Sequence, residues 1–577
     1  MNGTGFAYRT RLIVALGLIA LPSMAGAQSL AKYAPPGALF AVELVDLQGA
    51  KKTANAFITQ YEALDLVGSL LEAQNIPAKE LAMTKAMLGD FASLVDREGL
   101  VAIYVNPQTL EPDVLLAARP NTNANARVKK MLDDALLNAR KSGSKVITGK
   151  AGGFPMYTIK PRSGDFPMSM GYQGGIAFAG IGMNSVGSFL KRVAGAAQPG
   201  LASSSLYKSA LEPLGGGNIR VYADLGQLAG LAKAGVQRAD LNENEAIKLQ
   251  PILSALTTLG RYGSNFRVSP GGLESSSLFA PDIRGGDAAL YKLLTSAPDV
   301  TLKAASVVPA NVISFSTSKV DANGWYAYFS KLADTTKLNP GGLDPLIAKE
   351  LGLDFKTVGL SWLTGEFATA TFETKSKPNA SNAVSVLGDA VTYIGTTDEA
   401  LARQALEATI PRLVDLGNKL AQQEKTFSSA TSKAMISGVQ VTRYPVAQGI
   451  ALVSAIQNGY LMIATSDDAM IKALGTGPRL ADSATYKAAI AKIPEDASSF
   501  GYNDVPATIR SSLASVDEAL DGALALGMDI KPSAAKKLAA KLKKLLNFTL
   551  ERVGPVVNWT ITGPQGSRAR SFQPVKF

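Results

Sequence analysis

An internal repeat is the feature of this sequence that most constrains its fold. Residues 306–315 (SVVPANVISF) follow the plan of residues 33–42 (YAPPGALFAV), because in both segments a proline turn leads into an apolar strand. A helical region and then a strand bounded by glycine follow each segment. A chain of 577 residues is also too long for one ordinary hydrophobic core. We therefore expect two homologous domains, residues 28–300 and residues 301–577.

Later segments support the repeat because they recur in the same order in both halves. The matching pairs are SLYKSA (205–210) with ATYKAA (484–489), VYADL (221–225) with GYNDV (501–505), and FRVSPG (266–271) with WTITGP (559–564). No single pair is specific. Their common order indicates a duplication.

Short apolar runs that alternate with helical stretches predict an α+β fold, each half being a mainly antiparallel sheet covered by helices on one face. The clearest turn is Asn458-Gly459, because a type I′ hairpin needs positive φ at both central residues. Gly174-Gly175 occupies the matching place in the first half. We also expect a helix from residue 77 or 78 to about residue 94, and a strand at 383–387 paired with 367–372.

The first 27 residues have the pattern of a secretion signal. Arg9 and Arg11 precede an apolar stretch at 12–21, and Ala25-Gly26-Ala27 predicts cleavage before Gln28. The chain has no cysteine, which excludes lipid attachment and disulfides, so we expect a bacterial periplasm or cell envelope. No later run of about 18 apolar residues is present, so the mature chain should be soluble or membrane-peripheral, without a transmembrane span.

Charge gives a weak indication of partners. The leader carries two of the 58 basic residues and no acid, so the mature chain has 56 basic against 47 acidic residues, a net charge of +9. No dense basic motif with interleaved aromatic residues is present, which argues against nucleic acid. The excess favours envelope proteins, anionic lipid or envelope polymers as partners and leaves the oligomeric state open.

The absence of histidine and cysteine excludes most catalytic chemistry. Without them there is no Ser-His-Asp or Cys-His nucleophile, no ordinary zinc site, no haem held by His or Cys, and no thiol redox centre. We expect no cofactor and no metal. Carboxylate pairs and Ser–Lys dyads remain as catalytic options.

Two kinds of catalytic candidate fit those options. Among the S-x-x-K spacings, the best is Ser205 to Lys208, but the second half has Ala484 in place of the serine, which favours a capping and packing role. The carboxylate pairs are Asp96 with Glu98 and Asp354 with Glu366, each beside a strand edge. Other acids, Asp398-Glu399 and Asp467-Asp468, suit helix N-termini, and Gly215–Gly217 is a turn because no helix follows it.

The most distinctive local segment is an amphipathic basic helix over residues 531–546. Its leucines share one face at helical spacing. Five lysines could contact an anionic surface, although a solvated surface helix is the alternative: Lys536, Lys537, Lys541, Lys543 and Lys544.

The passage ELGLDF (350–355) followed by LSWLTGEFA (360–368) resembles a bacterial family of exported proteins, protein of unknown function 3352. The resemblance is best over residues 305–372, and the first half has LVDREGL (94–100) without the tryptophan. The resemblance implies an exported envelope protein and supplies no activity or site residues.

The hypothesis that these features favour is a non-enzymatic exported binding or structural protein. One alternative is a periplasmic carrier or chaperone that holds lipid or another apolar ligand between sheet and helices. A carboxylate-dependent hydrolase is the other, and it requires two carboxyl groups about 5 to 9 Å apart in a cleft.

Overall fold

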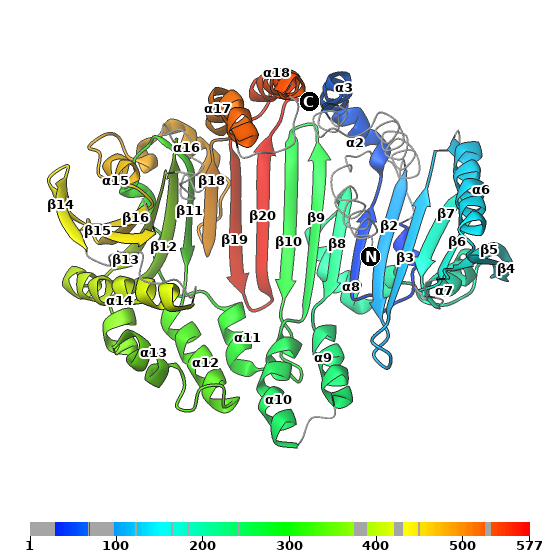
Figure 1. Cartoon of the computed structure of the whole chain (residues 1–577), viewed down its shortest axis with the longest axis horizontal. Coiled ribbons are helices and arrows are strands. Elements are labelled where there is room, and N and C mark those ends of the chain that lie inside the picture. Colours follow the sequence, from blue (N-terminus) through cyan, green and yellow to red (C-terminus); the bar gives the residue numbers. More distant parts are fainter. Residues whose placement is uncertain are drawn as a thin grey trace. The chain divides into compact units, whose positions relative to one another are not determined.

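A computed structural model describes residues 29–66, 69, 97–121, 124–162, 166–182, 184–239, 243–352, 354–373, 389–420, 431–447, 450–525 and 532–577. The chain divides into two compact units, shown by sequence colour in Figure 1. The first unit comprises residues 1–241, 259–284 and 576–577. The second unit comprises residues 242–258 and 285–575. The chain therefore contributes one helix to the second unit before the first unit is complete.

The first unit alternates strands with short helices. Its elements are η1 (Leu30–Lys32), β1 (Phe40–Leu44), α2 (Leu47–Thr53), α3 (Asn55–Leu64), β2 (Glu98–Val105), β3 (Pro112–Arg119), α6 (Asn125–Lys141), β4 (Lys145–Ala151), β5 (Phe154–Lys160), β6 (Met168–Gln173), β7 (Ile176–Ile181), α7 (Asn184–Val193), η3 (Leu201–Ser203), α8 (Ser205–Leu211), η4 (Glu212–Leu214), β8 (Ile219–Asp224), α9 (Gln227–Arg238), β9 (Arg261–Ser269) and β10 (Gly272–Ala280).

The second unit has longer helices around a similar set of strands. Its elements are α10 (Glu243–Thr258), α11 (Ala288–Thr295), η5 (Ala304–Ser306), β11 (Val312–Lys319), α12 (Ala322–Thr335), α13 (Leu343–Leu351), η6 (Phe355–Leu360), β12 (Leu363–Phe372), β13 (Asp389–Thr396), α14 (Glu399–Leu420), β14 (Ser432–Ile436), β15 (Val439–Ala447), β16 (Ile450–Gln457), β17 (Tyr460–Ala464), α15 (Asp467–Ala473), η8 (Leu480–Asp482), α16 (Ala484–Ile490), β18 (Ser499–Asn503), α17 (Val505–Ala525), α18 (Pro532–Leu550), β19 (Val556–Gly563) and β20 (Gly566–Pro574).

Each unit is built on antiparallel strand pairs, which confirms the predicted α+β class. In the first unit the order of neighbouring strands is β10-β9-β8-β1-β2-β3-β7-β6-β5-β4. In the second unit it is β20-β19-β18-β11-β12-β13-β17-β16-β15-β14. The two orders correspond strand for strand.

The predicted type I′ hairpins are confirmed by their backbone angles. Asn458 and Gly459 have φ of 54° and 76°, and Gly174 and Gly175 have φ of 61° and 75°. Positive φ at both central residues matches the turn to the twist of the flanking strands. These turns set the register of β16 with β17 and of β6 with β7.

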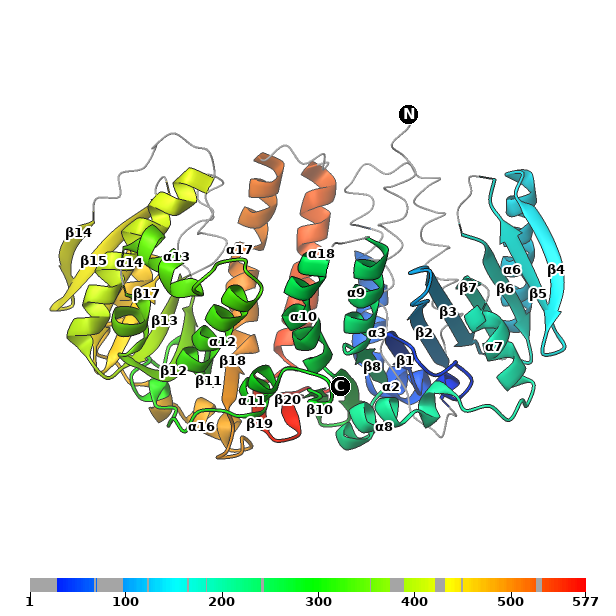
Figure 2. The same cartoon turned by 90° about the horizontal axis from the view of Figure 1, so that it is seen from below.

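Helices cover both faces of the strands, whereas we expected one. In the second unit Met462 of β17 packs in a core with Met470 of α15 and Tyr486 of α16. Its neighbour Leu461 points to the opposite face and packs with Ala402 of α14. Figure 2 views these strands from their ends, with α14 and α16 on opposite sides. Strands that are apolar on both faces need cover on both.

Some predictions concern residues outside the described ranges: the secretion signal, the helix at 77–94, and the strand at 383–387. The strand that pairs with β12 is β13, which begins at Asp389. Within the described helices none is long and apolar enough to span a membrane.

Candidate functional site

Buried carboxylates are the strongest candidates for a functional site, because catalytic acids and bases usually lie where burial and neighbouring charges shift their pKa values. In the described part of the chain, five acidic side chains are buried: Glu43, Glu98, Asp224, Glu366 and Asp389. The groups that contact each carboxylate decide what it can do.

Glu366 of β12 caps the short helix η5. Its Oε1 accepts hydrogen bonds from the backbone N–H groups of Lys303 and Ala304, both at 2.8 Å, and from Thr317 Oγ1 at 3.2 Å. Its Oε2 accepts the Tyr460 hydroxyl at 2.6 Å. Burial, and then this hydrogen bond, raises the pKa of Tyr460, so the tyrosine stays a donor. Both carboxylate oxygens of Glu366 therefore already hold protein donors.

The two carboxylates of the predicted pair, Asp354 and Glu366, have different surroundings. Asp354 is exposed and accepts hydrogen bonds from Thr357 Oγ1 at 2.6 Å and Thr357 N at 3.1 Å, which caps η6. These bonds lower the pKa of Asp354. Glu366 is buried on different partners. Asp354 is thus a capping residue for the helix that precedes Trp362.

Glu43 of β1 holds the short helix η1 in the same way that Glu366 holds η5. It accepts hydrogen bonds from Ala31 N at 3.2 Å, from the Ser29 hydroxyl and from the Tyr207 hydroxyl. Arg220 lies opposite on β8, with Nη1 4.0 Å from Glu43 Oε2. In each unit, therefore, a buried carboxylate and a tyrosine hold the first short helix, although the carboxylate comes from a different strand.

Glu98 of β2 is the least satisfied of the buried acids. It lies opposite Arg119 of β3, and its Oε2 is 3.6 Å from Arg119 Nη1. That oxygen has no hydrogen-bond partner among the described residues. Burial raises the pKa of Glu98, and the Arg119 charge offsets this only in part. Its predicted partner Asp96 lies outside the described ranges.

We expect the Glu98→Gln variant to remove one source of pH dependence from stability. Because the folded pKa of Glu98 is raised above 4.5, the folded state binds more protons than the unfolded state just above that pH. The free energy of unfolding therefore falls as pH rises through this window. Urea denaturation should therefore show that the free energy of unfolding of the variant, relative to the wild type, is higher at about pH 7 than at about pH 4.5. A parallel pH dependence in both proteins would contradict this.

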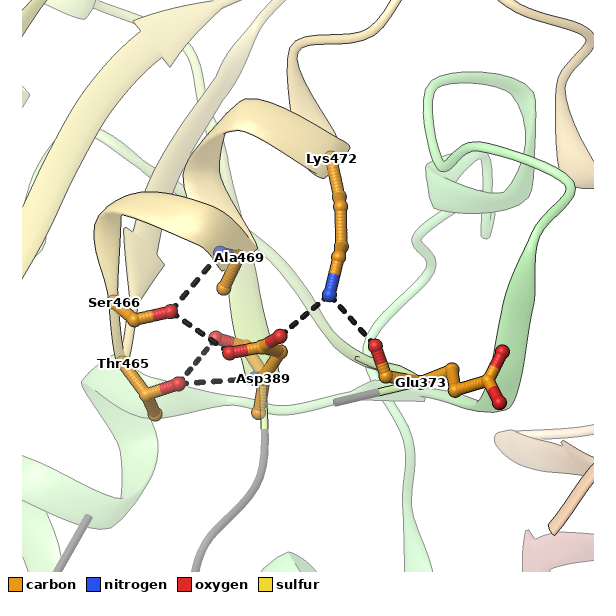
Figure 3. A network of polar contacts seen from close by, with 7 residues as sticks. Glu373, Asp389, Thr465, Ser466, Ala469 and Lys472 are labelled. Carbon is orange, nitrogen blue, oxygen red and sulfur yellow. Dashed lines mark hydrogen bonds and ion pairs between the residues drawn. The ribbon is translucent and has the colours of Figure 1, made fainter. Parts of the chain in front are cut away.

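Asp389 of β13 is the centre of a polar network at the start of α15 (Figure 3). The Ser466 hydroxyl donates to Asp389 Oδ1 at 2.9 Å and accepts from Ala469 N at 3.0 Å. Lys472 Nζ donates to Asp389 Oδ2 at 2.5 Å and to the Glu373 carbonyl at 2.7 Å. The serine hydroxyl is thus held by the carboxylate and the helix terminus, which describes a helix cap.

The first unit has a simpler version of this network. Asp113 of β3 accepts directly from Ser185 N at 2.8 Å and from Ser185 Oγ at 2.5 Å, at the start of α7. Sequence reasoning missed both aspartates. A signal was present, because in each half a lone Asp stands just before the apolar core of a strand, as DVLLAA (113–118) and DAVTYIG (389–395).

Replacing Lys472 with methionine should lower the free energy of unfolding by about 1–2 kcal/mol, because Asp389 loses a charged donor. The lysine side chain is 20% exposed and the aspartate side chain 7%. Thermal unfolding measures the effect. The control is Lys487→Met, which removes an exposed lysine of α16. Equal stability of the two variants would show that the ion pair contributes nothing.

The structure also places the remaining candidate residues. Ser205 and Lys208 of α8 are both exposed, whereas Tyr207 between them is buried on Glu43. Asp398 caps α14 through Leu401 N at 2.9 Å, and Asp467-Asp468 begin α15, as expected. Gly215, with φ of 74°, ends η4 and leads to β8. No group of three metal-binding side chains occurs within the described ranges.

The predicted basic helix is present as α18, which packs against α17. Lys536, Lys537 and Lys544 are exposed, and Lys541 and Lys543 are half-buried. Lys543 forms an ion pair with Asp517 of α17. The four leucines of its apolar face, at 538, 542, 545 and 546, are half-buried. Contact between the exposed lysines and an anionic surface stays a prediction.

Comparison with solved structures gives only weak matches. Among solved structures, TP0453 in crystal form IV is 10% identical, with a TM-score of 0.22, over 44% of this chain and 81% of that chain. Crystal form III gives 10% identity and a TM-score of 0.23 over 48% and 91%. At these scores the likeness carries no argument. No curated protein matches the sequence.

The family match is extensive. The family described as "Protein of unknown function (DUF3352)" matches residues 192–521, which is more than half of the chain and begins in α7 and ends in α17. It includes the passage 350–368, on which we based the resemblance. The chain therefore belongs to the family described as protein of unknown function (DUF3352).

Proposed function

We propose that this protein is an exported, non-enzymatic component of the bacterial cell envelope with a binding or structural role. One observation carries the proposal: Glu43 and Glu366 hold short helices in place, and Asp113 and Asp389 hold helix N-termini. A general acid or base needs a free oxygen directed at a substrate. These carboxylates instead accept backbone and hydroxyl donors of the protein itself.

We also propose that the two units are copies of one ancestral domain. Their strand orders correspond, and each unit contains a tyrosine pair, Tyr207–Tyr222 and Tyr486–Tyr502, with ring centroids 5.2 and 5.5 Å apart. Backbone contacts also match. Leu201 N donates to Ala34 O at 2.8 Å, and Leu480 N donates to Val308 O at 2.7 Å. The sequence repeat and these contacts support a duplication that divides the chain near residue 300.

The structural role of the carboxylates has a direct test. Catalytic residues commonly cost stability, so replacing one often stabilises the protein. A structural carboxylate behaves in the opposite way. We expect Glu43→Gln and Glu366→Gln both to unfold at lower urea concentration than the wild type. A variant that is more stable than the wild type would contradict the structural role and reopen the hydrolase alternative.

Export has a separate test. The full chain, produced in a bacterial host, should be recovered from the periplasmic or membrane fraction with Gln28 as its first residue. Recovery from the cytoplasm with residues 1–27 attached would contradict export. The exposed lysines of α18 and the net charge of +9 are consistent with contact to anionic envelope polymers or lipid.

A further inference from the structure

Helix α18 carries a positive charge that no acid on the same helix balances. Its residues Pro532–Leu550 include five lysines and no acid. Lys536, Lys537 and Lys544 are exposed, and among the described residues they form no ion pair. We call these three residues the lysine face. Lys541 lies four residues after Lys537 and three before Lys544, spacings at which like charges repel, so this concentration of charge calls for an explanation.

The fold does not require this charge. The helix at the same place in the first half of the chain is α10, because it precedes β9 as α18 precedes β19. α10 carries one base, Lys248, against two acids, Glu243 and Glu245. The positive charge is therefore a property of α18 and not of the shared strand order.

The lysines and the leucines of α18 lie on opposite sides of the helix. At 3.6 residues per turn, its exposed positions fall within one arc of about 100°. None of these positions holds a large apolar residue: they are Ser533, Lys536, Lys537, Ala540, Lys544 and Asn547. The half-buried leucines at 538, 542, 545 and 546 lie on the other side. The side of α18 that solvent reaches most freely is therefore polar and positive.

The position of α18 lets a flat surface reach the lysine face. α18 packs against α17, and Figure 1 shows both helices beyond one end of β18, β19 and β20, at the margin of the second unit. Lys537 and Lys544 lie nearly in line along the helix, about 10 Å apart, and Lys536 lies about 90° around it. A plane of anionic groups can meet all three, because each charge sits on a long flexible stem. A narrow polymer chain along Lys537 and Lys544 would leave Lys536 unpaired.

We propose that the lysine face docks on the surface of an anionic phospholipid bilayer. Charge complementarity carries the assignment, because lysines clustered on an amphipathic helix attract phosphate head groups. The contact needs no insertion of hydrophobic side chains, since the exposed arc of α18 holds no large apolar residue. Its strength therefore depends on lipid charge and on ionic strength. The inference rests on the proposed envelope location, where the protein meets bilayers, and it names the partner of the proposed binding role.

Vesicle flotation with the purified chain from Gln28 measures this contact. We expect binding to vesicles that contain phosphatidylglycerol and no binding to vesicles of phosphatidylcholine alone. Binding should be lost at about 1 M salt, where charges are screened beyond about 3 Å. Lys536→Gln/Lys537→Gln/Lys544→Gln should weaken binding about tenfold or more, because the exposed charges of α18 are removed. Lys536→Arg/Lys537→Arg/Lys544→Arg keeps the charge and should bind as the wild type does.

The matched control removes the same charge elsewhere. Lys129 and Lys130 of α6 and Lys208 of α8 are exposed, and α6 also carries the exposed acids Asp133 and Asp134. Lys129→Gln/Lys130→Gln/Lys208→Gln should therefore bind vesicles as the wild type does. Thermal unfolding verifies that both glutamine variants are folded. Equal weakening by the two glutamine variants would show that net charge drives binding, and it would overturn the assignment to α18.

Other outcomes would also overturn the bilayer contact. These are no vesicle binding by the folded wild type, undiminished binding by the glutamine variant of the lysine face, or equal binding to phosphatidylcholine alone. Binding of soluble polyphosphate through the lysine face, without binding to vesicles, would assign the face to a free polyanion instead. A periplasmic chain that fails to bind vesicles leaves the proposed function standing. A cytoplasmic chain that binds them leaves the lipid contact standing without the envelope role.

Discussion

Replacing Glu366 with alanine should lower the free energy of unfolding by about 4 kcal/mol, one of the two largest effects we expect. The carboxylate accepts four hydrogen bonds: two from backbone N–H groups at η5, one from Thr317 and one from Tyr460. All four donors lose their acceptor at a residue that is 3% exposed. A buried donor without a partner costs about 1–3 kcal/mol.

Urea denaturation of the full chain measures this effect. Glu366→Gln keeps one carbonyl acceptor and should show a smaller loss. Glu551→Ala, at a glutamate whose side chain is 74% exposed, is the control and should change stability by less than about 0.5 kcal/mol. An alanine variant at position 366 as stable as the Glu551 control would show that the carboxylate does not hold η5 in place.

Glu366 also shows what sequence reasoning could and could not find. Its place beside a strand edge marked it as unusual, but its role depends on Tyr460, 94 residues away, and on Lys303, 63 residues away. Those contacts follow from strand order, which a local pattern does not contain. Glu98 was also selected as a catalytic candidate, but Arg119, its partner across the sheet, was not.

The fold was predictable where a local signal determined the geometry. Asn458-Gly459 and Gly174-Gly175 predicted their hairpins because positive φ is a local requirement. β13 was harder to predict from the sequence, because its threonines at 392 and 396 interrupt the apolar pattern. Its burial comes from the neighbouring strands β12 and β17. A proline inside a helix usually kinks or breaks it, yet α10 continues through Pro251, where it packs against α11 and α12.

Separating the chain after Arg284 should leave neither fragment with the stability of the whole. Fragment 285–577 lacks α10, although α10 packs on α11 and α12 within the second unit. Thr258, fully buried at the end of α10, accepts a hydrogen bond from Asp287 N at 2.5 Å, beside the cap of α11. Loss of this helix should cost the second unit more than about 5 kcal/mol, enough to unfold a domain of ordinary stability.

Mixing the fragments gives the decisive measurement. Fragment 28–284 carries α10, so the two should associate and regain a cooperative unfolding transition. Thr258→Val, which removes the acceptor for Asp287 N, should weaken that association about fivefold or more. Thr295→Val, at a half-buried threonine whose hydroxyl donates to Tyr291 O within α11, is the matched control. Two fragments that each unfold cooperatively, with no tendency to associate, would show that α10 is dispensable. The two units would then be self-sufficient domains, although the division of the chain places in the second unit a helix encoded before the first unit is complete.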